Sequence, residues 1–183
     1  QSEDKLVYED ASRPQAFHQV YADETERFVF LIISDRSKKP GNALWYYDSK
    51  SSDLKFKPLF AEPGDFEYDF IDEHNGRFLI LTNEGAKNNQ LVSIDPANPS
   101  KANWKVIIAE KEENIASVGA AGGKMFVSYS KDVTSRVYRY SYDGKMESEV
   151  VLPTLGTAGG FGGEKDDKFV FYTFTSFTYP PTI

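Results

Sequence analysis

The chain contains two histidines, His18 and His74, and histidine is the side chain that most often acts as a general acid or base in enzymes. A catalytic triad also needs a nucleophile beside the histidine and an acid that orients it. The serines that could serve lie in strand-like stretches without a Gly-x-Ser-x-Gly turn: Ser128, Ser130 and Ser176. His74 precedes Asn75-Gly76, a pair typical of tight hairpins. We therefore predict ordinary strand and turn histidines, and no catalytic triad in this chain.

Two acidic pairs resemble the paired carboxylates of a glycosidase. Glu67 and Asp69 are two residues apart, so they share one face of a strand, and a solvated strand face explains them. The second pair, Asp72-Glu73, follows directly. The chain has no cysteine, which excludes disulfides, Cys-ligated zinc and a cysteine nucleophile. The glycine-rich stretches at 119–123 and 156–163 lack the Gly-Lys-Ser/Thr of a phosphate loop, so we predict neither a cofactor nor a metal.

The elements that must position these residues recur four times. In each copy a basic residue begins a run of apolar and aromatic residues: Arg27, Arg77, Lys124 and Lys168, at intervals of 50, 47 and 44 residues. Three copies then add a second apolar strand that leads into an acidic turn. A period in this range, built from short strands, is typical of β-propeller blades.

The sequence therefore predicts an all-β fold, a partial β-propeller with about three complete four-stranded antiparallel blades and part of a fourth. The blades are expected at about 10–61, 62–110, 111–153 and 154–183, the last incomplete. A short leading strand is expected at 6–8, and the fourth blade is expected to have strands at 157–161 and 168–174. Pro180-Pro181 is interpreted as a strand breaker, and Thr182-Ile183 is expected to begin another strand. Open terminal blades leave apolar faces bare, so we expect either an excised piece of a larger ring or self-association through open blade edges.

The net charge of the chain excludes some classes of binding partner. The net charge of −7 and the pI of about 4.9 argue against nucleic acid and against an anionic membrane surface. No apolar run approaches the roughly 20 residues that span a bilayer. We expect a soluble protein, with a cytoplasmic or a periplasmic location left open.

Several segments in order along the chain resemble the propeller domain of the prolyl oligopeptidase family of serine peptidases. The segments are residues 42–48, 67–70, 82–83 with Asn88 and Leu91, 99–107 and 174–183. The most specific is the last, a Phe-Thr-Ser-Phe run followed by a proline pair and a closing strand. The resemblance covers essentially the whole chain and implies about the second half of a seven-bladed ring.

This resemblance implies that catalysis and the control of substrate access are carried out by two different domains. The triad would lie in a separate α/β-hydrolase domain of the same parent chain, and the propeller would admit only short peptides to cleavage after proline. It also implies two substrate-binding positions in the propeller. Phe17 takes the place of an apolar residue before a strand. Arg36 is the candidate for an arginine after the next strand that binds the substrate backbone; if Asp35 takes that position instead, this contact is missing.

The main alternative is a stand-alone propeller-like module that binds a ligand or a protein and closes by self-association. Two half-rings would together provide seven or eight blades. A tight, compact dimer in light scattering would favour this alternative, or would show that a fragment covers its open ends artificially. A glycosidase-type propeller rests on the carboxylates alone.

Overall fold

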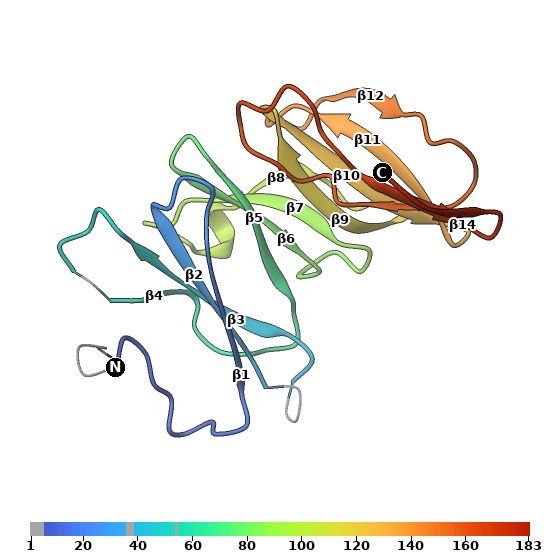
Figure 1. Ribbon diagram of the computed structural model, residues 1–183. Coiled ribbons are helices and arrows are strands. Elements are labelled where there is room, and N and C mark those ends of the chain that lie inside the picture. The colour runs from blue at the N-terminus through green and yellow to red at the C-terminus, as the bar shows by residue number, and fades with distance from the viewer. Residues whose placement is uncertain (1–5, 36–38, 54) are drawn as a thin grey trace. The chain divides into compact units, whose positions relative to one another are not determined.

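The computed structural model describes residues 6–35, 39–53 and 55–183 (Figure 1). The chain divides into two compact units, residues 1–68 and 69–183, which we describe separately. Within the described residues there are four antiparallel sheets and one short 3-10 helix, η1 (Lys101–Asn103). No helix in this part of the chain is long and apolar enough to cross a bilayer.

Each sheet is a meander in which sequential strands pair with one another. Sheet A contains β1 (Phe17–Ala22), β2 (Phe28–Ser34), β3 (Asn42–Asp48) and β4 (Lys57–Phe60). Sheet B contains β5 (Tyr68–His74), β6 (Arg77–Thr82), β7 (Gln90–Ile94) and β8 (Lys105–Ile108). Sheet C contains β9 (Asn114–Ala121), β10 (Lys124–Lys131), β11 (Thr134–Tyr140) and β12 (Met146–Val150). Sheet D has three strands, β13 (Thr157–Gly159), β14 (Thr173–Ser176) and β15 (Tyr179–Thr182). The predicted fold class, a partial propeller, is confirmed.

The central strands carry the core. From Phe78 to Thr82, every residue of β6 is buried, because both faces of this strand are covered. In unit 1, Leu31, Ile33 and Ala43 form a buried cluster with Tyr8 and Trp45 packed against it. In unit 2, sheets B and C share one apolar cluster, which includes Leu79, Ile108, Val118 and Met125. A second cluster joins sheets C and D through Val137, Phe161 and Phe174.

Two-residue turns close three of the hairpins. Asn75-Gly76, Gly122-Gly123 and Asp132-Val133 each place both residues at positive φ, between 48° and 76°. This is the type I′ geometry, whose twist matches that of the strands it joins. The hairpin predicted at Asn75-Gly76 is confirmed.

The basic residue that opens each repeat unit has a structural role in three of the four copies. Arg27 donates to the carboxylate of Asp48 at the end of β3, with Nε and Nη2 3.3 and 3.1 Å from its oxygens. Arg77 donates to the hydroxyl and carbonyl oxygens of Ser93 on β7, at 2.8 and 2.9 Å. Lys124 pairs with Glu147 on β12. In these three copies the basic residue of the repeat therefore bonds to a residue on a later strand of its own sheet.

Each unit contains one of the two tryptophans. Trp45 lies on β3 of unit 1, and its indole nitrogen donates to the carbonyl oxygen of Ala61 at 3.1 Å. Trp104 follows η1 in unit 2 and donates to the carbonyl oxygen of Pro99 at 2.9 Å. Both indole N–H groups are therefore held by backbone carbonyls within their own unit.

Three predictions at the ends of the chain are wrong. Residues 6–8 form no strand, although Tyr8 packs on the unit 1 cluster. The strand expected at 168–174 begins only at Thr173, and residues 160–172 form a long irregular connection instead. Pro180 and Pro181 lie inside β15, where they do not break it. Proline is compatible with this position because β15 is an edge strand and its missing N–H groups need no partner strand.

Candidate functional site

Phe17, the predicted apolar contact, is the first residue of β1 and lies opposite Ser34 at the end of β2. Its side chain is 74% exposed, so it does not belong to the unit 1 core. An exposed aromatic ring at the end of a hairpin can pack against an apolar group of a bound molecule. It cannot transfer a proton, so this position supports binding and not catalysis.

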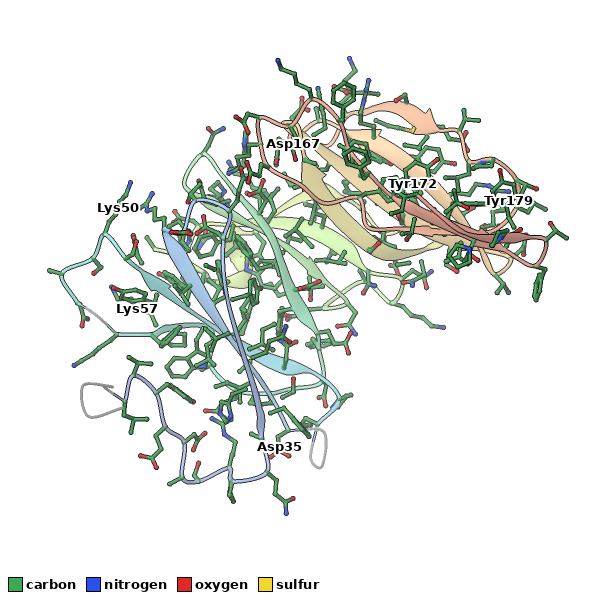
Figure 2. The ribbon with its side chains drawn as sticks, in the orientation of Figure 1. Asp35, Lys50, Lys57, Asp167, Tyr172 and Tyr179 are labelled. Carbon is green, nitrogen blue, oxygen red and sulfur yellow. The ribbon has the colours of Figure 1, made fainter. Side chains whose placement is uncertain are left out.

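The second predicted position follows β2. Asp35 is buried, and its carbonyl oxygen accepts a hydrogen bond from the Lys39 N–H at 3.1 Å. Figure 2 labels Asp35 at this end of sheet A. Arg36, the alternative at the same position, lies outside the described residues. The structure therefore places Phe17 and Asp35 at the same end of one hairpin, because Phe17 pairs with the residue before Asp35.

Contacts with residues 65–68 hold residues 39–42 in place before β3. The Asn42 side chain, which is buried, donates from Nδ2 to the Tyr68 carbonyl oxygen at 3.0 Å and accepts from the Tyr68 N–H at 2.8 Å. Lys39 and Asp65 form an exposed ion pair, with Nζ and Oδ1 2.8 Å apart. A Cβ atom on Gly41 would overlap the Phe66 carbonyl oxygen, so only glycine fits there. Hydrogen bonds and an ion pair therefore hold this end of sheet A in place, and the exposed ring of Phe17 lies there.

A groove of about 640 Å³ runs over the open face of sheet A, and it does not contain the predicted site. Its walls are mainly apolar and include Val20, Val29, Leu31 and Phe56. His18 lines this groove, whereas Phe17 does not. The His18 ring is 5.6 Å from the Tyr8 ring and tilted by 52°, which is an aromatic packing contact.

The remaining candidates for catalysis are dispersed. Ser128 and Ser130 lie on β10 and Ser176 on β14, as predicted. Glu67 and Asp69 are both exposed, in keeping with a solvated strand face. Among the residues that the structure describes, no group of three His, Cys, Asp or Glu side chains is placed to hold a metal ion.

Sequence reasoning missed one polar cluster in unit 2. The Asp72 carboxylate on β5 is buried and accepts a hydrogen bond from the Tyr142 hydroxyl, and Lys165 Nζ lies 3.3 Å from its Oδ1 atom. The His74 ring stacks on the Tyr142 ring, with centroids 4.3 Å apart and an angle of 5°. Tyr142 and Lys165 are 70 and more than 90 residues from β5 along the chain, so no local pattern indicates the cluster.

The surroundings of Asp48 and Tyr129 shift the pKa values of these two side chains. The hydrogen bonds from Arg27 hold the pKa of Asp48 below its ordinary value of 3.8. Burial, followed by the hydrogen bond with Tyr140, raises the pKa of Tyr129 above 10. Lys111 Nζ lies 4.8 Å from the centre of the Tyr129 ring and 3.2 Å from the Tyr140 hydroxyl oxygen, which is a cation–π contact on a buried tyrosine pair. Both shifts follow from ion pairing and burial within their own sheets.

Comparisons with known proteins agree with this architecture. The family model described as the N-terminal β-propeller domain of prolyl oligopeptidase matches residues 1–183. The prolyl endopeptidase of Elizabethkingia miricola is 35% identical over 185 residues, and that of Elizabethkingia meningoseptica is 32% identical over 183 residues. Each alignment covers 100% of this chain and 25% of the relative, so the chain spans about a quarter of their length.

Solved structures give the same result. One from a structural and mechanistic study of two prolyl endopeptidases has a TM-score of 0.85 and 30% identity, and it covers 98% of this chain and 26% of that one. Prolyl oligopeptidase B from Galerina marginata has a TM-score of 0.86 at 21% identity, which supports the fold alone. With its whole length matched by the family model and its fold shared with these enzymes, the chain belongs to the N-terminal β-propeller family of the prolyl oligopeptidases.

Proposed function

We propose that this chain is a non-catalytic propeller segment of a prolyl oligopeptidase-type serine peptidase. Its role is to gate the access of short proline-containing peptides to a separate α/β-hydrolase domain of the same parent protein. The observation that carries the proposal is the match over the whole chain to the propeller of prolyl endopeptidases that are about four times its length. The absence of any cysteine and the dispersed serines and histidines are compatible with a catalytic centre elsewhere.

The edge of sheet A is the part of the chain that we propose contacts the peptide. Phe17 presents its ring to solvent at the end of a hairpin, and Asp35 or Arg36 follows the partner strand. The exposed ring of Phe17 can pack on an apolar side chain of a peptide, and Arg36 at the second position would bind the peptide backbone. With the buried Asp35 at that position instead, the backbone contact would be missing.

The first experiment is an assay of the purified 183-residue chain for cleavage after proline. We expect no turnover, because the proposal assigns the nucleophile to another domain. Sustained turnover that follows enzyme concentration would contradict the non-catalytic assignment.

The second experiment tests gating in the full parent peptidase. The Phe17→Ala variant should lower kcat/KM for short prolyl peptides by roughly ten-fold, in line with the loss of one aromatic contact. A series of peptides of increasing length should show kcat/KM falling steeply with length. Equal kcat/KM for peptides of every length would argue against a gate, even if Phe17 proved to bind substrate.

Self-association remains the competing use of this chain, and one observation favours it. Unit 2 exposes several large apolar side chains: Val151, Leu155, Phe169, Phe171, Phe177 and Ile183. Light scattering separates the two functions. A tight, compact dimer would favour a stand-alone binding module, and a monomer would favour the peptidase segment.

A further inference from the structure

The connection between β13 and β14, residues 160–172, is longer than the two-residue turns that join the first two strands of sheets B and C. We call it the β13–β14 strap. Its last residues alternate as a strand would. Val170 and Tyr172 pack on the cluster between sheets C and D, whereas Phe169 and Phe171 are 76% and 71% exposed. The sequence therefore predicts a strand where the structure has none, and such local conflicts tend to mark functional or strained segments.

The backbone of the strap is bonded to sheet C. The Gly163 N–H donates to the Ala120 carbonyl oxygen on β9 at 3.0 Å, and the Gly122 N–H donates to the Glu164 carbonyl oxygen at 2.8 Å. A Cβ atom on Gly122, which has φ of +57°, would lie 2.7 Å from the Asp167 carbonyl oxygen. The strap thus lies in backbone contact with the β9–β10 hairpin.

The Lys165 side chain links the strap to sheet B. Lys165 Nζ donates to the Glu73 carbonyl oxygen at 2.8 Å and lies 3.3 Å from the Asp72 Oδ1 atom, both on β5. The same carboxylate accepts hydrogen bonds from the Glu73 N–H and from the Tyr142 hydroxyl, which comes from sheet C. The buried Asp72 carboxylate of sheet B is therefore joined to one side chain of the strap and to one of the turn between β11 and β12.

The base of the strap is held differently from its tip. Phe161 is buried, and its ring stacks on Phe126 of sheet C at 5.8 Å and on Tyr172 at 4.8 Å between centroids. The tip, residues 162–168, depends instead on the two backbone hydrogen bonds and on Lys165. Figure 2 labels Tyr172 and Asp167, which belong to the base and the tip respectively. Apolar packing fixes the base, whereas polar contacts fix the tip.

We infer that Lys165 is a latch that fastens the tip of the β13–β14 strap to β5. Its side chain is 36% exposed, so water can replace its contacts when it leaves. Release lets residues 162–168 swing off the ends of β5 and β9, while the B–C and C–D apolar clusters keep the three sheets together. Gly160, with φ of +85°, allows the chain to turn at the base. The latch is a property of the chain itself and stands apart from the proposed peptidase role.

Amide hydrogen exchange measured by NMR on the 183-residue chain tests the latch. The Lys165→Met variant keeps the aliphatic stem and removes the charge. It should speed the exchange of the Gly122 and Gly163 amides roughly ten-fold, since charge-assisted hydrogen bonds are the stronger kind. The amides of β10 and β11 should keep their rates, and Lys165→Arg should restore most of the protection.

Lys168→Met is the matched control, because it removes a lysine from the same tip that forms no ion pair with a described residue. It should leave all these rates unchanged. Three results would each overturn the latch. The first is unchanged rates in Lys165→Met, and the second is an equal change in Lys168→Met. The third is a uniform acceleration that includes β10 and β11, since that would report lower global stability instead of local release.

Discussion

At the scale of single residues, exposure separates a binding side chain from a packing one. Phe17 and Phe30 are both phenylalanines of the β1–β2 hairpin, yet the first is 74% exposed and the second 0%. An aromatic residue at the start of a strand fits both roles in sequence, so the pattern alone could not decide between them. Long-range packing decides, because it determines which ring the folded chain covers.

This contrast gives a stability prediction. Phe17→Ala should change the free energy of unfolding by less than about 0.5 kcal/mol, as exposed substitutions do. Phe30→Ala should cost about 3–5 kcal/mol, because it leaves a cavity in the core. Urea unfolding followed by circular dichroism measures both. A large loss of stability in Phe17→Ala would assign that ring to the core and remove it from the proposed binding edge.

The Arg27–Asp48 pair gives a pH dependence. The pKa of Asp48 is lowered in the folded chain by the hydrogen bonds from Arg27, so its contribution to stability is present above the unfolded pKa of about 3.8. That contribution is lost as the pH falls through the lower folded value. The Asp48→Asn variant should therefore be less stable than the unsubstituted 183-residue chain at pH 7, by about 1 kcal/mol or less for a partly exposed pair.

Thermal unfolding from pH 7 down to pH 2 is the measurement. The difference between the two chains should shrink below pH 4. A difference that is constant across the range would show that the loss in Asp48→Asn has another cause than charge.

At the scale of the elements, local signals explain the turns and fail for the strap. Asn75-Gly76 predicts its hairpin because both residue types accept positive φ. Residues 168–172 read as a strand because their side chains alternate, but Val170 and Tyr172 satisfy that alternation by packing on sheet C without a partner strand. Strand pairing depends on long-range geometry, whereas side-chain alternation is local, so the second does not guarantee the first.

The turn Asp132-Val133 predicts a stabilising change. Val133 has φ of +61° and is 92% exposed, so its branched side chain bears the steric cost of the left-handed region without gaining packing. Val133→Gly should raise the free energy of unfolding by about 1 kcal/mol. The midpoint of urea unfolding reports this change.

Gly76→Val is the reciprocal control. Gly76 has φ of +76°, and a Cβ atom there would meet nothing within 4 Å, so the substitution tests conformation alone. It should lower stability by about 1–2 kcal/mol. If both substitutions left the midpoint unchanged, the left-handed turn geometry would not be limiting in either hairpin.

At the scale of the whole molecule, the period of the repeat predicts the order in which the sheets follow one another along the chain. It does not predict the contacts between the sheets. Spacings of 44 to 50 residues give meanders in order along the chain, because each strand pairs with its neighbour in sequence. The Asp72 cluster brings together residues 70 and more than 90 positions apart, and nothing in the separate segments indicates it. Arg36 remains a prediction, since it lies outside the described residues.

Glycine where β9 meets the base of the β13–β14 strap gives a test of this packing. A Cβ atom on Gly119 of β9 would overlap the Phe161 carbonyl oxygen, whereas one on Gly159 of β13 would meet nothing within 4 Å. Gly119→Ala should destabilise the chain by about 1–3 kcal/mol, as overpacking does, and Gly159→Ala should be nearly neutral. Calorimetry of the two variants is the measurement. Equal melting temperatures would mean that β9 and the Phe161 backbone of the strap do not approach as closely as the structure has them.

The placement of one tryptophan in each unit has a practical consequence for fluorescence. Trp45 reports on residues 1–68 and Trp104 on residues 69–183, each from an indole held by a backbone carbonyl of its own unit. The tryptophan emission of a Trp45→Phe chain comes only from the second unit, and that of a Trp104→Phe chain only from the first. Emission curves of the two chains in denaturant would coincide if the units melt as one cooperative block, and would separate if each melts alone.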